Sequence, residues 1–350
     1  MGRQLRIKLK TGRHRPFSLH VNILVNTIMR TGFVAFLGVL LAVAKTTVAD
    51  LTGNSNPSPS VDKREIPAWQ FYYGVDSAQH QTNFNKWIAA GYRMISLSAY
   101  GQPPNNIYAA VWVQRSGVAW QAIHEASGAT YQSWFDTQSA AGYVSTLITA
   151  TGSGSGAVFA GVMEKISVSN WYQKCDLTTE QYETELSNAQ GNRYTLRSFT
   201  EYSTASNRRY CGIWHANPTF DKYTAWVDES YSDYQLTFND EVMKAWRPYY
   251  VTVSEDHLIT SAFTDTDIGF WVARHGMTAS GLQAEYETQE AAGHYLINLQ
   301  GGGTGGDAQY TGIWADREIP APPMSLREFP SAIIAALSFV LLLAPGQFVS

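Results

Sequence analysis

A pattern of aromatic, Gln and Gly residues recurs five times along the chain at nearly constant intervals. Each copy opens with an aromatic residue, followed eleven residues later by a second anchor and then a Gln, by a Gly-Tyr step, and by a segment ending in Gly-Ile-Trp or a variant of it. The opening residues lie 51, 51, 52 and 48 residues apart: Trp69, Trp120, Trp171, Tyr223 and Trp271. A period of this size over five copies predicts a repeat architecture in which neighbouring units share one core.

The other anchors place a Gln near the middle of each copy and an aromatic at its end. The Gln positions are Gln81, Gln132, Gln235 and Gln283, with Glu183 in the third copy, and the closing residues are Trp112, Met163, Trp214, Trp271 and Trp314. In this alignment Trp271 both ends the fourth copy and opens the fifth. We expect the rings to fill the space between units, because each carries ~150–250 Å² of surface that packing can bury. For the Gln residues, hydrogen bonds to the backbone of a neighbouring repeat explain the recurrence better than ligand binding.

Within one copy the periodicity changes from that of a helix to that of strands. Tyr131, Trp134 and Phe135 have the i, i+3, i+4 spacing of one helix face within the stretch from Trp120 to Phe135. Gly142 follows, where the end of a helix needs a residue that tolerates positive φ. In the first copy, residues 93–99 alternate, residues 101–106 break the pattern with Gly, Pro and Asn, and residues 108–112 resume it. The predicted unit is a helix plus a β-hairpin, and the fold class is α+β.

The five units form one domain at about residues 67–320 by this pattern. The copies span residues 67–115, 116–166, 167–217, 218–270 and 271–320. The periodicity is compatible with an open solenoid and with a closed, propeller-like ring. Closure is favoured by a pentapeptide, Arg-Glu-Ile-Pro-Ala, which occurs at residues 64–68 and again at residues 317–321.

The N-terminal 49 residues resemble a secretory leader. They hold eight Lys or Arg and no acid, and residues 33–44 are an uncharged apolar run, too short for a membrane span of ~20 residues. We expect the true start to be Met29 and the alternative to be an uncleaved signal anchor. Residues 50–66 form a polar, flexible lead-in. The chain is therefore expected to be secreted and extracellular.

Removal of the leader makes the chain strongly acidic. The whole sequence has 25 basic and 29 acidic residues, so 17 basic residues and a net charge of −12 remain. A charge of this sign argues against nucleic acid as a partner.

Residues 321–350 contain a Pro-rich segment and an apolar run at residues 332–344. A C-terminal membrane or lipid anchor, a mis-spliced gene end and a buried final helix are the three explanations, and we favour the second. Apart from such an anchor, no stable membrane span is expected.

The two cysteines, Cys175 and Cys211, belong to the same copy. In an oxidising compartment they are candidates for a disulfide, and two separate buried thiols are the alternative.

The sequence provides no motif for catalysis or for binding a metal or cofactor. The histidines lack metal-ligand spacing, and Asp265-Thr266-Asp267 lacks the further oxygen ligands of a calcium loop. Residues 301–306 match a dinucleotide motif by letters only, since they lie between two predicted strands. The one Ser-x-x-Lys, Ser60-Val61-Asp62-Lys63, falls in the polar lead-in. We expect no catalytic residue, metal or cofactor in this chain.

The repeat pattern resembles the bacterial tandem repeat domain, which also forms the N-terminal half of fungal polyglycine hydrolases. The resemblance rests on Tyr-Gln-x-x-Phe-Asp and Tyr-x-Gly-Ile-Trp, as in residues 131–136, 210–214 and 310–314, and it covers residues 67–320. It implies a secreted protein in which a following serine hydrolase half, with its own Ser-x-x-Lys, cuts glycine-rich linkers in plant chitinases. This sequence stops where that half would begin.

Three functions are compatible with these observations. The first, which we favour, is a secreted, non-catalytic repeat domain that docks an extracellular protein, as in the N-terminal half of a polyglycine hydrolase. The second is a serine-type endopeptidase whose hydrolase half is missing through gene misprediction. The third is a carbohydrate-binding module, in which aromatics between Gly-rich hairpin tips bind a glycan.

Overall fold

The computed structural model describes residues 66–219, 221–304 and 306–317. The predicted leader with Met29, almost all of the lead-in with Ser60, and the apolar run at residues 332–344 lie outside these residues. The recurring pentapeptide lies mostly outside them as well.

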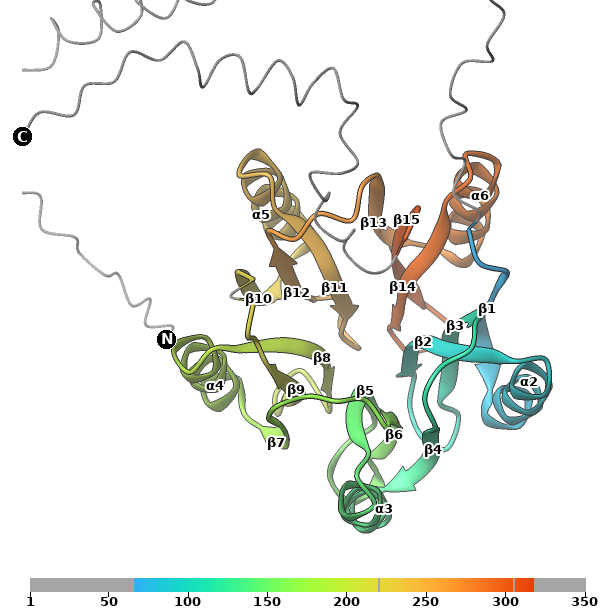
Figure 1. Cartoon of the computed structure of the whole chain (residues 1–350). Helices are drawn as coiled ribbons and strands as arrows, with labels where there is room; N and C mark the ends of the chain where they lie inside the picture. The colour runs from blue at the N-terminus through green and yellow to red at the C-terminus, as the bar shows by residue number, and fades with distance from the viewer. Residues whose placement is uncertain (1–65, 220, 305, 318–350) are drawn as a thin grey trace, which may run out of the picture. The chain divides into compact units, whose positions relative to one another are not determined.

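Each of the five units consists of a three-stranded antiparallel sheet and one helix (Figure 1). The units are β1 (Trp69–Asp76), α2 (Ser77–Ala89), β2 (Tyr92–Tyr100) and β3 (Ile107–Gln114); β4 (Trp120–Ser127), α3 (Gly128–Ala140), β5 (Val144–Thr151) and β6 (Val158–Glu164); β7 (Trp171–Leu177), α4 (Thr179–Gly191), β8 (Tyr194–Tyr202) and β9 (Arg209–Ala216); β10 (Tyr223–Glu229), α5 (Tyr231–Met243), β11 (Arg247–Val253) and β12 (Ile259–Thr264); and β13 (Trp271–Met277), α6 (Ala279–Ala291), β14 (Tyr295–Gly302) and β15 (Gln309–Ala315). The predicted helix and hairpin are confirmed. Each repeat has in addition a first strand, which pairs with the last strand of the same repeat.

The opening aromatic begins this first strand, and the helix begins eight residues later. A short polar side chain precedes every helix and accepts a hydrogen bond from a backbone N–H of the first turn, which would otherwise lack a partner. These caps are Asp76, Ser127, Thr178, Ser230 and Thr278. The segment from Trp120 to Phe135, which the spacing assigned to one helix, is therefore divided between β4 and α3.

The helices end as the glycine pattern predicts. Gly91, Gly142 and Gly293 have φ values of 79°, 84° and 83°. In the third and fourth repeats, Arg193 and Ala245 occupy the same position with φ values of 62° and 63°. The left-handed turn is thus part of the repeat even where no glycine is present.

The alignment of the fourth repeat needs a correction. Residue Thr224, next to the opening Tyr223, pairs with Phe263, just as Gln70 pairs with Trp112 in the first repeat. Phe263 therefore occupies the closing position, and Gly269-Phe270-Trp271 is not part of the last strand of the fourth repeat. Trp271 only opens β13. The prediction failed because the loop after β12 carries a chance copy of the Gly-aromatic-Trp letters.

The five sheets are arranged around a common centre, with the helices on the outside (Figure 1). The second strand of each repeat lies innermost, and these strands contact one another in the cyclic order β2, β5, β8, β11 and β14, with β14 against β2. Hydroxyl groups join consecutive inner strands at intervals close to the repeat length: the N–H of Ala99 donates to Thr149 Oγ1 (2.9 Å) and that of Ile148 donates to Ser198 Oγ (3.2 Å).

The same type of bond closes the ring. The N–H of Leu299 donates to Ser96 Oγ (3.0 Å), which joins the last repeat to the first.

Candidate functional site

The opening aromatics occupy equivalent places between repeats. Each packs against an apolar side chain from the helix of the preceding repeat: Phe84 lies 5.8 Å from Trp120 between ring centroids, Phe135 lies 5.6 Å from Trp171, and Phe238 lies 6.0 Å from Trp271. Tyr286 of the last helix contacts Trp69 of the first strand at 5.6 Å. Between the third and fourth repeats, Leu186 of the helix and the opening Tyr223 belong to the same cluster of buried core residues.

The closing residues are buried within the sheets. Trp112, Trp214 and Trp314 are fully buried, as is Met163 in the second repeat. These side chains pack in the interior of the protein and expose no surface to a ligand.

The recurring Gln residues do not form the expected hydrogen bonds between repeats. Each donates to the side chain four positions further along its own helix: Gln81 to Asn85, Gln132 to Asp136, Gln235 to Asn239 and Gln283 to Glu287. Gln81 also bonds His124 of the next repeat, through its side chain and not through the backbone. The i, i+4 spacing explains the outcome, because two such side chains lie on the same face of a helix.

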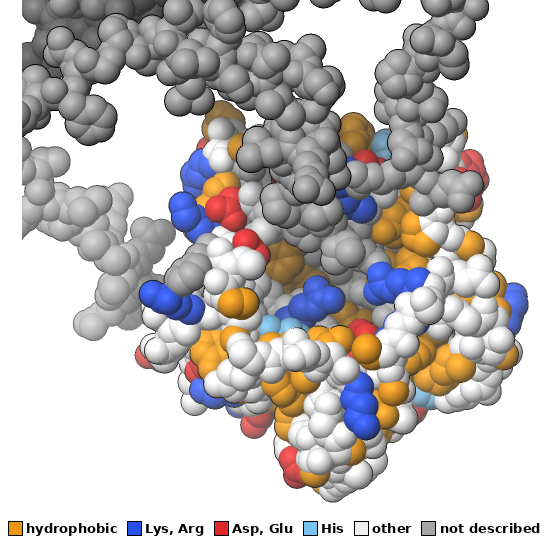
Figure 2. All heavy atoms as spheres, viewed as in Figure 1, with side chains coloured by type: hydrophobic (Ala, Val, Ile, Leu, Met, Phe, Trp, Pro, Cys, Tyr) orange, Lys and Arg blue, Asp and Glu red, His pale blue; other side chains and the backbone are white. Residues whose placement is uncertain are grey.

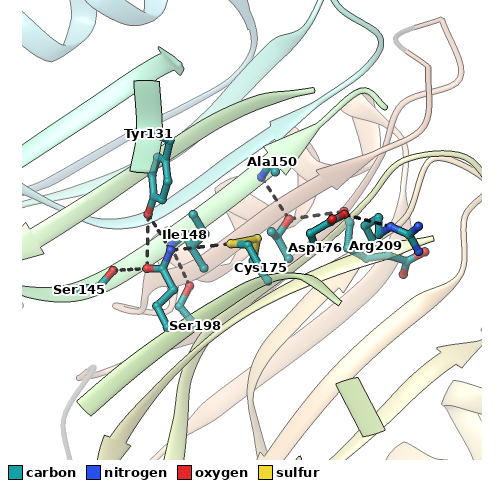
Figure 3. The surroundings of a disulfide bond; sticks show 12 residues. Tyr131, Ser145, Ile148, Ala150, Cys175, Asp176, Ser198 and Arg209 are labelled. Carbon is teal, nitrogen blue, oxygen red and sulfur yellow. Dashed lines mark hydrogen bonds and ion pairs between the residues drawn. A yellow bond between two sulfur atoms is a disulfide. The ribbon is translucent and has the colours of Figure 1, made fainter. Parts of the chain in front are cut away.

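Cys175 on β7 and Cys211 on β9 are joined by a disulfide within the third repeat (Figure 3). The bond lies beside a groove of about 840 Å³ between α3 of the second repeat and β7 of the third. Polar groups at this groove include the exposed Gln132 and Asn207, and the ion pair of Arg209 with Asp176 (3.0 Å); Phe135 is half-buried in its wall.

At the groove, the disulfide occupies a position that holds a ring in three other repeats. The residue four positions after the opening aromatic is Tyr73, His124 or His275 in three other repeats, and each of these contacts the preceding repeat. In the third repeat this residue is Cys175, which bonds to its own sheet.

A second cavity lies on the ring axis, where the inner strands begin. It has a volume of about 280 Å³, and its wall combines apolar residues with Arg115, Arg197 and Arg247. We call it the axial cavity; the residues lining it are Met94, Ile95, Arg115, Thr146, Leu147, Glu164, Thr195, Leu196, Arg197, Asp221, Arg247, Tyr249, Tyr250, Thr264, Thr266, Ile297 and Asn298. Figure 2 shows basic side chains beside the hollow at the centre of this face.

The charged groups around the axial cavity shift one another's pKa values. Burial, together with the charge of Arg197, lowers the pKa of His215 to about 4. Burial lowers the pKa of Arg115, and Glu164 opposes this effect while Arg93 and Arg197 add to it. Several arginines therefore lie close together around the axial cavity, although the chain as a whole has more acidic than basic residues.

The hairpin loops meet at the opposite end of the axis. We call their combined surface the tip face; its described residues are 101–106, 152–157, 203–208, 254–258, 303–304 and 306–308. The loops of the fourth, fifth and first repeats are joined by backbone hydrogen bonds: the N–H of Gly303 donates to the carbonyl of Ser254 (3.1 Å), and that of Gly101 donates to the carbonyl of Gly303 (3.2 Å). A narrow pocket of about 20 Å³ lies between them.

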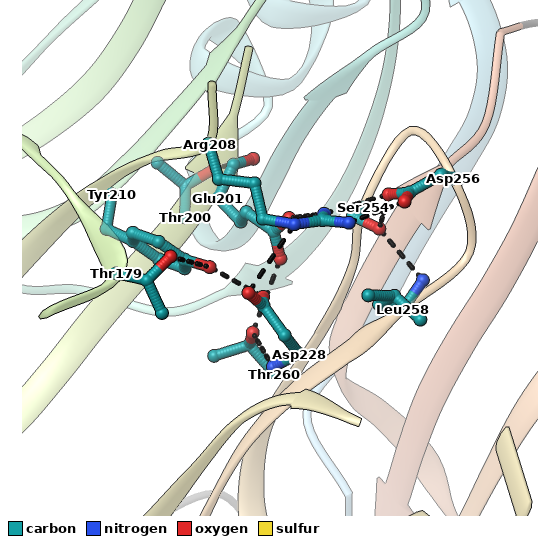
Figure 4. A network of polar contacts seen from close by, with 10 residues as sticks. All are labelled: Thr179, Thr200, Glu201, Arg208, Tyr210, Asp228, Ser254, Asp256, Leu258 and Thr260. Carbon is teal, nitrogen blue, oxygen red and sulfur yellow. Dashed lines mark hydrogen bonds and ion pairs between the residues drawn. The ribbon is translucent and has the colours of Figure 1, made fainter. Parts of the chain in front are cut away.

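A polar network that reaches from the buried Glu201 to the exposed Asp256 joins two of these loops (Figure 4). Arg208 forms ion pairs with Glu201, with Asp256 (2.5 Å) and with Asp228 (3.4 Å), and Tyr210 donates to Asp228 at 2.5 Å. Burial raises the pKa of Glu201, and the nearby Asp228 adds to the effect. The network joins the third repeat to the fourth, because Arg208 and Asp256 lie in successive loops.

The repeat geometry agrees with a known family. Four segments of the chain, residues 66–115, 117–166, 169–217 and 270–317, match the family described as "Polyglycine hydrolase-like, structural repeat", and together they cover more than half of the sequence. The chain belongs to the polyglycine hydrolase-like structural repeat family. The segment without a match is the fourth repeat, which lacks the Gly-Ile-Trp ending and carries Ser261-Ala262-Phe263 in its place.

Two further properties concern only the described part of this polyglycine hydrolase-like repeat protein. Among residues 66–317, apart from 220 and 305, no group of His, Cys, Asp and Glu is placed to hold a metal ion. In the same part of the chain no helix has the length and apolar character that crossing a membrane requires.

Proposed function

We propose that this chain is a secreted, non-catalytic repeat domain that binds an extracellular protein through the tip face. Membership in the polyglycine hydrolase-like family supports a role as a docking domain beside a hydrolase. The basic leader with its apolar core, and the disulfide of the third repeat, support secretion into an oxidising compartment. The recurring aromatic anchors support a scaffold role, since they pack between and within the repeats.

The observation that carries the proposal is the convergence of five loops on one rigid ring. Loops held by a rigid scaffold are common binding surfaces, because they vary without disturbing the core. Here the loops of the third, fourth, fifth and first repeats are bonded to a neighbouring loop, so that little conformational entropy is lost in them when a partner binds. Asn105, Ser155 and Asn207 are exposed on different loops of the tip face.

Binding to a chitinase with a glycine-rich linker tests this function. The full chain is purified from a secreting host, and its affinity for the immobilised chitinase is compared with that for the same enzyme without the linker. Asn105→Arg and Asn207→Arg are each expected to weaken binding about tenfold or more, because a bulky charge replaces a small polar group in the interface. Gln283→Arg, on the outer face of α6, is the matched control and should bind normally.

Two results would contradict the proposal. If the tip-face variants bind as tightly as the unchanged chain, the tip face is not the docking surface. If the purified chain cleaves the linker, the domain is not a non-catalytic binder.

The groove between the second and third repeats favours a carbohydrate as the alternative ligand. Amide, carboxylate and guanidinium groups along its rim are suited to sugar hydroxyls, and Phe135 offers a partly exposed ring. Retention on insoluble chitin or cellulose tests this function. Asn207→Ala should reduce retention, whereas Gln283→Ala should not.

A further inference from the structure

The first and fourth repeats carry the same arginine, but only one of the two has a carboxylate opposite it. Arg93 on β2 pairs in register with Val113, and Arg247 on β11 pairs in register with Thr264, so that the two arginines are equivalent. Both are about nine-tenths buried. Arg93 forms an ion pair of 2.6 Å with Glu164, which lies on β6 of the following repeat.

The position of Glu164 is occupied by alanine after the fourth repeat. Glu164 pairs in register with the opening Trp120, and in the fifth repeat the residue that pairs with the opening Trp271 is Ala315. Strand β11 packs against β15, as β2 packs against β6. Arg247 therefore lacks the partner that Arg93 has, because the position equivalent to Glu164 carries no carboxylate in the fifth repeat.

Arg247 is held by neutral acceptors. Its Nε donates to the carbonyl of Thr266 (2.7 Å) and its Nη2 donates to Thr266 Oγ1 (2.8 Å). Asp267 acts on the guanidinium electrostatically, but no ion pair between them is among the contacts of the described residues. Arg247 and the exposed Arg197 both line the axial cavity.

We propose that the axial cavity binds an organic carboxylate, whose charge takes the place that Glu164 has beside Arg93. Guanidinium groups form charge-assisted, often bidentate hydrogen bonds with carboxylates. Leu147 and Ile297 provide an apolar wall for the body of such a ligand, and a volume of about 280 Å³ accommodates a small acid or the C-terminal residue of a peptide. Asp221 also lines the cavity, and its charge repels a doubly charged inorganic anion more strongly than a monoanionic carboxylate. This site is independent of the tip face.

Ligand-observed NMR on the full chain at low ionic strength tests the proposal. The probes are isobutyrate, its neutral isostere isobutyramide, inorganic phosphate, and a short peptide that ends in leucine as the acid or as the amide. The acid of each pair is expected to bind about tenfold more tightly than its amide, because the ion pair is lost with the charge. Binding of both acids identifies free organic acids as sufficient ligands, and binding of the peptide acid alone identifies a chain terminus; either result supports a carboxylate site.

Three variants locate the site. Arg197→Gln should weaken isobutyrate binding about tenfold. Ala315→Glu places a carboxylate at the position equivalent to Glu164. This carboxylate should pair with Arg247 and thereby abolish binding of the ligand. Lys86→Gln, which removes an exposed charge on α2, is the matched control and should bind normally. Thermal unfolding verifies that each variant is folded, and Arg197→Gln alone decides the question if Ala315→Glu does not fold.

The proposal is overturned if neither acid binds more tightly than its own amide, or if Arg197→Gln leaves the affinity for the acid that binds unchanged. Tighter binding of phosphate than of both organic acids would also overturn it, because the site would then recognise an inorganic anion.

Discussion

The second anchor of each repeat shows how different side chains serve one position. His80, Tyr131, Tyr182, Tyr234 and Leu282 are all buried under the helix that carries them. His80 is the one of these whose ordinary pKa, in an unfolded chain, lies near neutral pH. Its Nδ1 shares a hydrogen bond of 2.8 Å with the hydroxyl of Tyr72, and its ring stacks on Tyr108.

Acid is expected to destabilise the protein through His80. Burial, with a smaller contribution from His124, lowers the pKa of His80 to about 3 in the folded state. The unfolded chain therefore binds a proton at about pH 6.5 that the folded chain does not bind, and stability is lost as the pH falls below that value. Urea unfolding between pH 6.5 and 4.5 measures the loss. It should be smaller for His80→Leu, which copies the residue of the fifth repeat, and equal slopes would contradict the assignment.

The disulfide of the third repeat is expected to contribute substantially to stability. Cys175 and Cys211 are 36 residues apart in sequence. A cross-link closing a loop of this length stabilises by about 4 kcal/mol in the chain-entropy model. The Cys175→Ala/Cys211→Ala variant should lose free energy of unfolding by about this amount in urea titrations. Reductant should destabilise the unchanged chain and leave the variant unaffected, and equal sensitivity would show that the bond does not form.

At the scale of single elements, the helix ends separate backbone effects from packing effects. Gly142 and Ala245 occupy the same left-handed position in the second and fourth repeats. A side chain built at Gly142 would meet no atom within 4 Å. The cost of a non-glycine residue here is therefore one of backbone conformation alone.

Exchange of these two residues should shift stability in opposite directions. Ala245→Gly relieves the left-handed strain of an L-residue and is expected to stabilise by about 1 kcal/mol after the entropy of glycine is subtracted. Gly142→Ala should destabilise by about the same amount. Thermal unfolding of the two variants and of the unchanged chain provides the comparison. A loss of stability in Ala245→Gly would mean that the Ala245 methyl group makes favourable contacts that outweigh the strain.

The first strand of each repeat escaped prediction, although a signal for it was present. Its residues are half-buried and irregular, and a bulge with positive φ interrupts each one, as at Glu125, Asp176 and Asp228. A bulge shifts the alternation of inward and outward residues, so that period-two patterns fail. The caps at Ser127 and Thr178 mark where each helix starts, and they exclude the preceding residues from it.

At the scale of the whole molecule, closure of the ring gives the first and last repeats a neighbour on both sides, as the middle repeats have. Ser96 and Ser198 lie at equivalent positions of β2 and β8 and are both fully buried. Ser96 Oγ accepts from Leu299 across the junction of the ends, and Ser198 Oγ accepts from Ile148 between neighbours. In an open stack, the end position would have no such partner.

Ser96→Ala and Ser198→Ala are therefore expected to destabilise the protein to a similar extent. Each leaves a buried N–H without its acceptor, at a cost of about 1–3 kcal/mol. Chemical unfolding followed by tryptophan fluorescence measures both variants under the same conditions. A cost for Ser198→Ala together with no cost for Ser96→Ala would contradict a closed ring in solution.

The sequence alone determined the number of repeats, their helix and hairpin, and the aromatic anchors, because these depend on a local periodicity repeated five times. The tertiary structure decided which residues meet across repeats, and these contacts follow from strand register and ring closure. Neither the groove beside Cys175 nor the unmatched Arg247 at the axis is visible in one repeat by itself. Each arises where one repeat lies against the next, and a pattern within one repeat does not record which residues of the next repeat it meets.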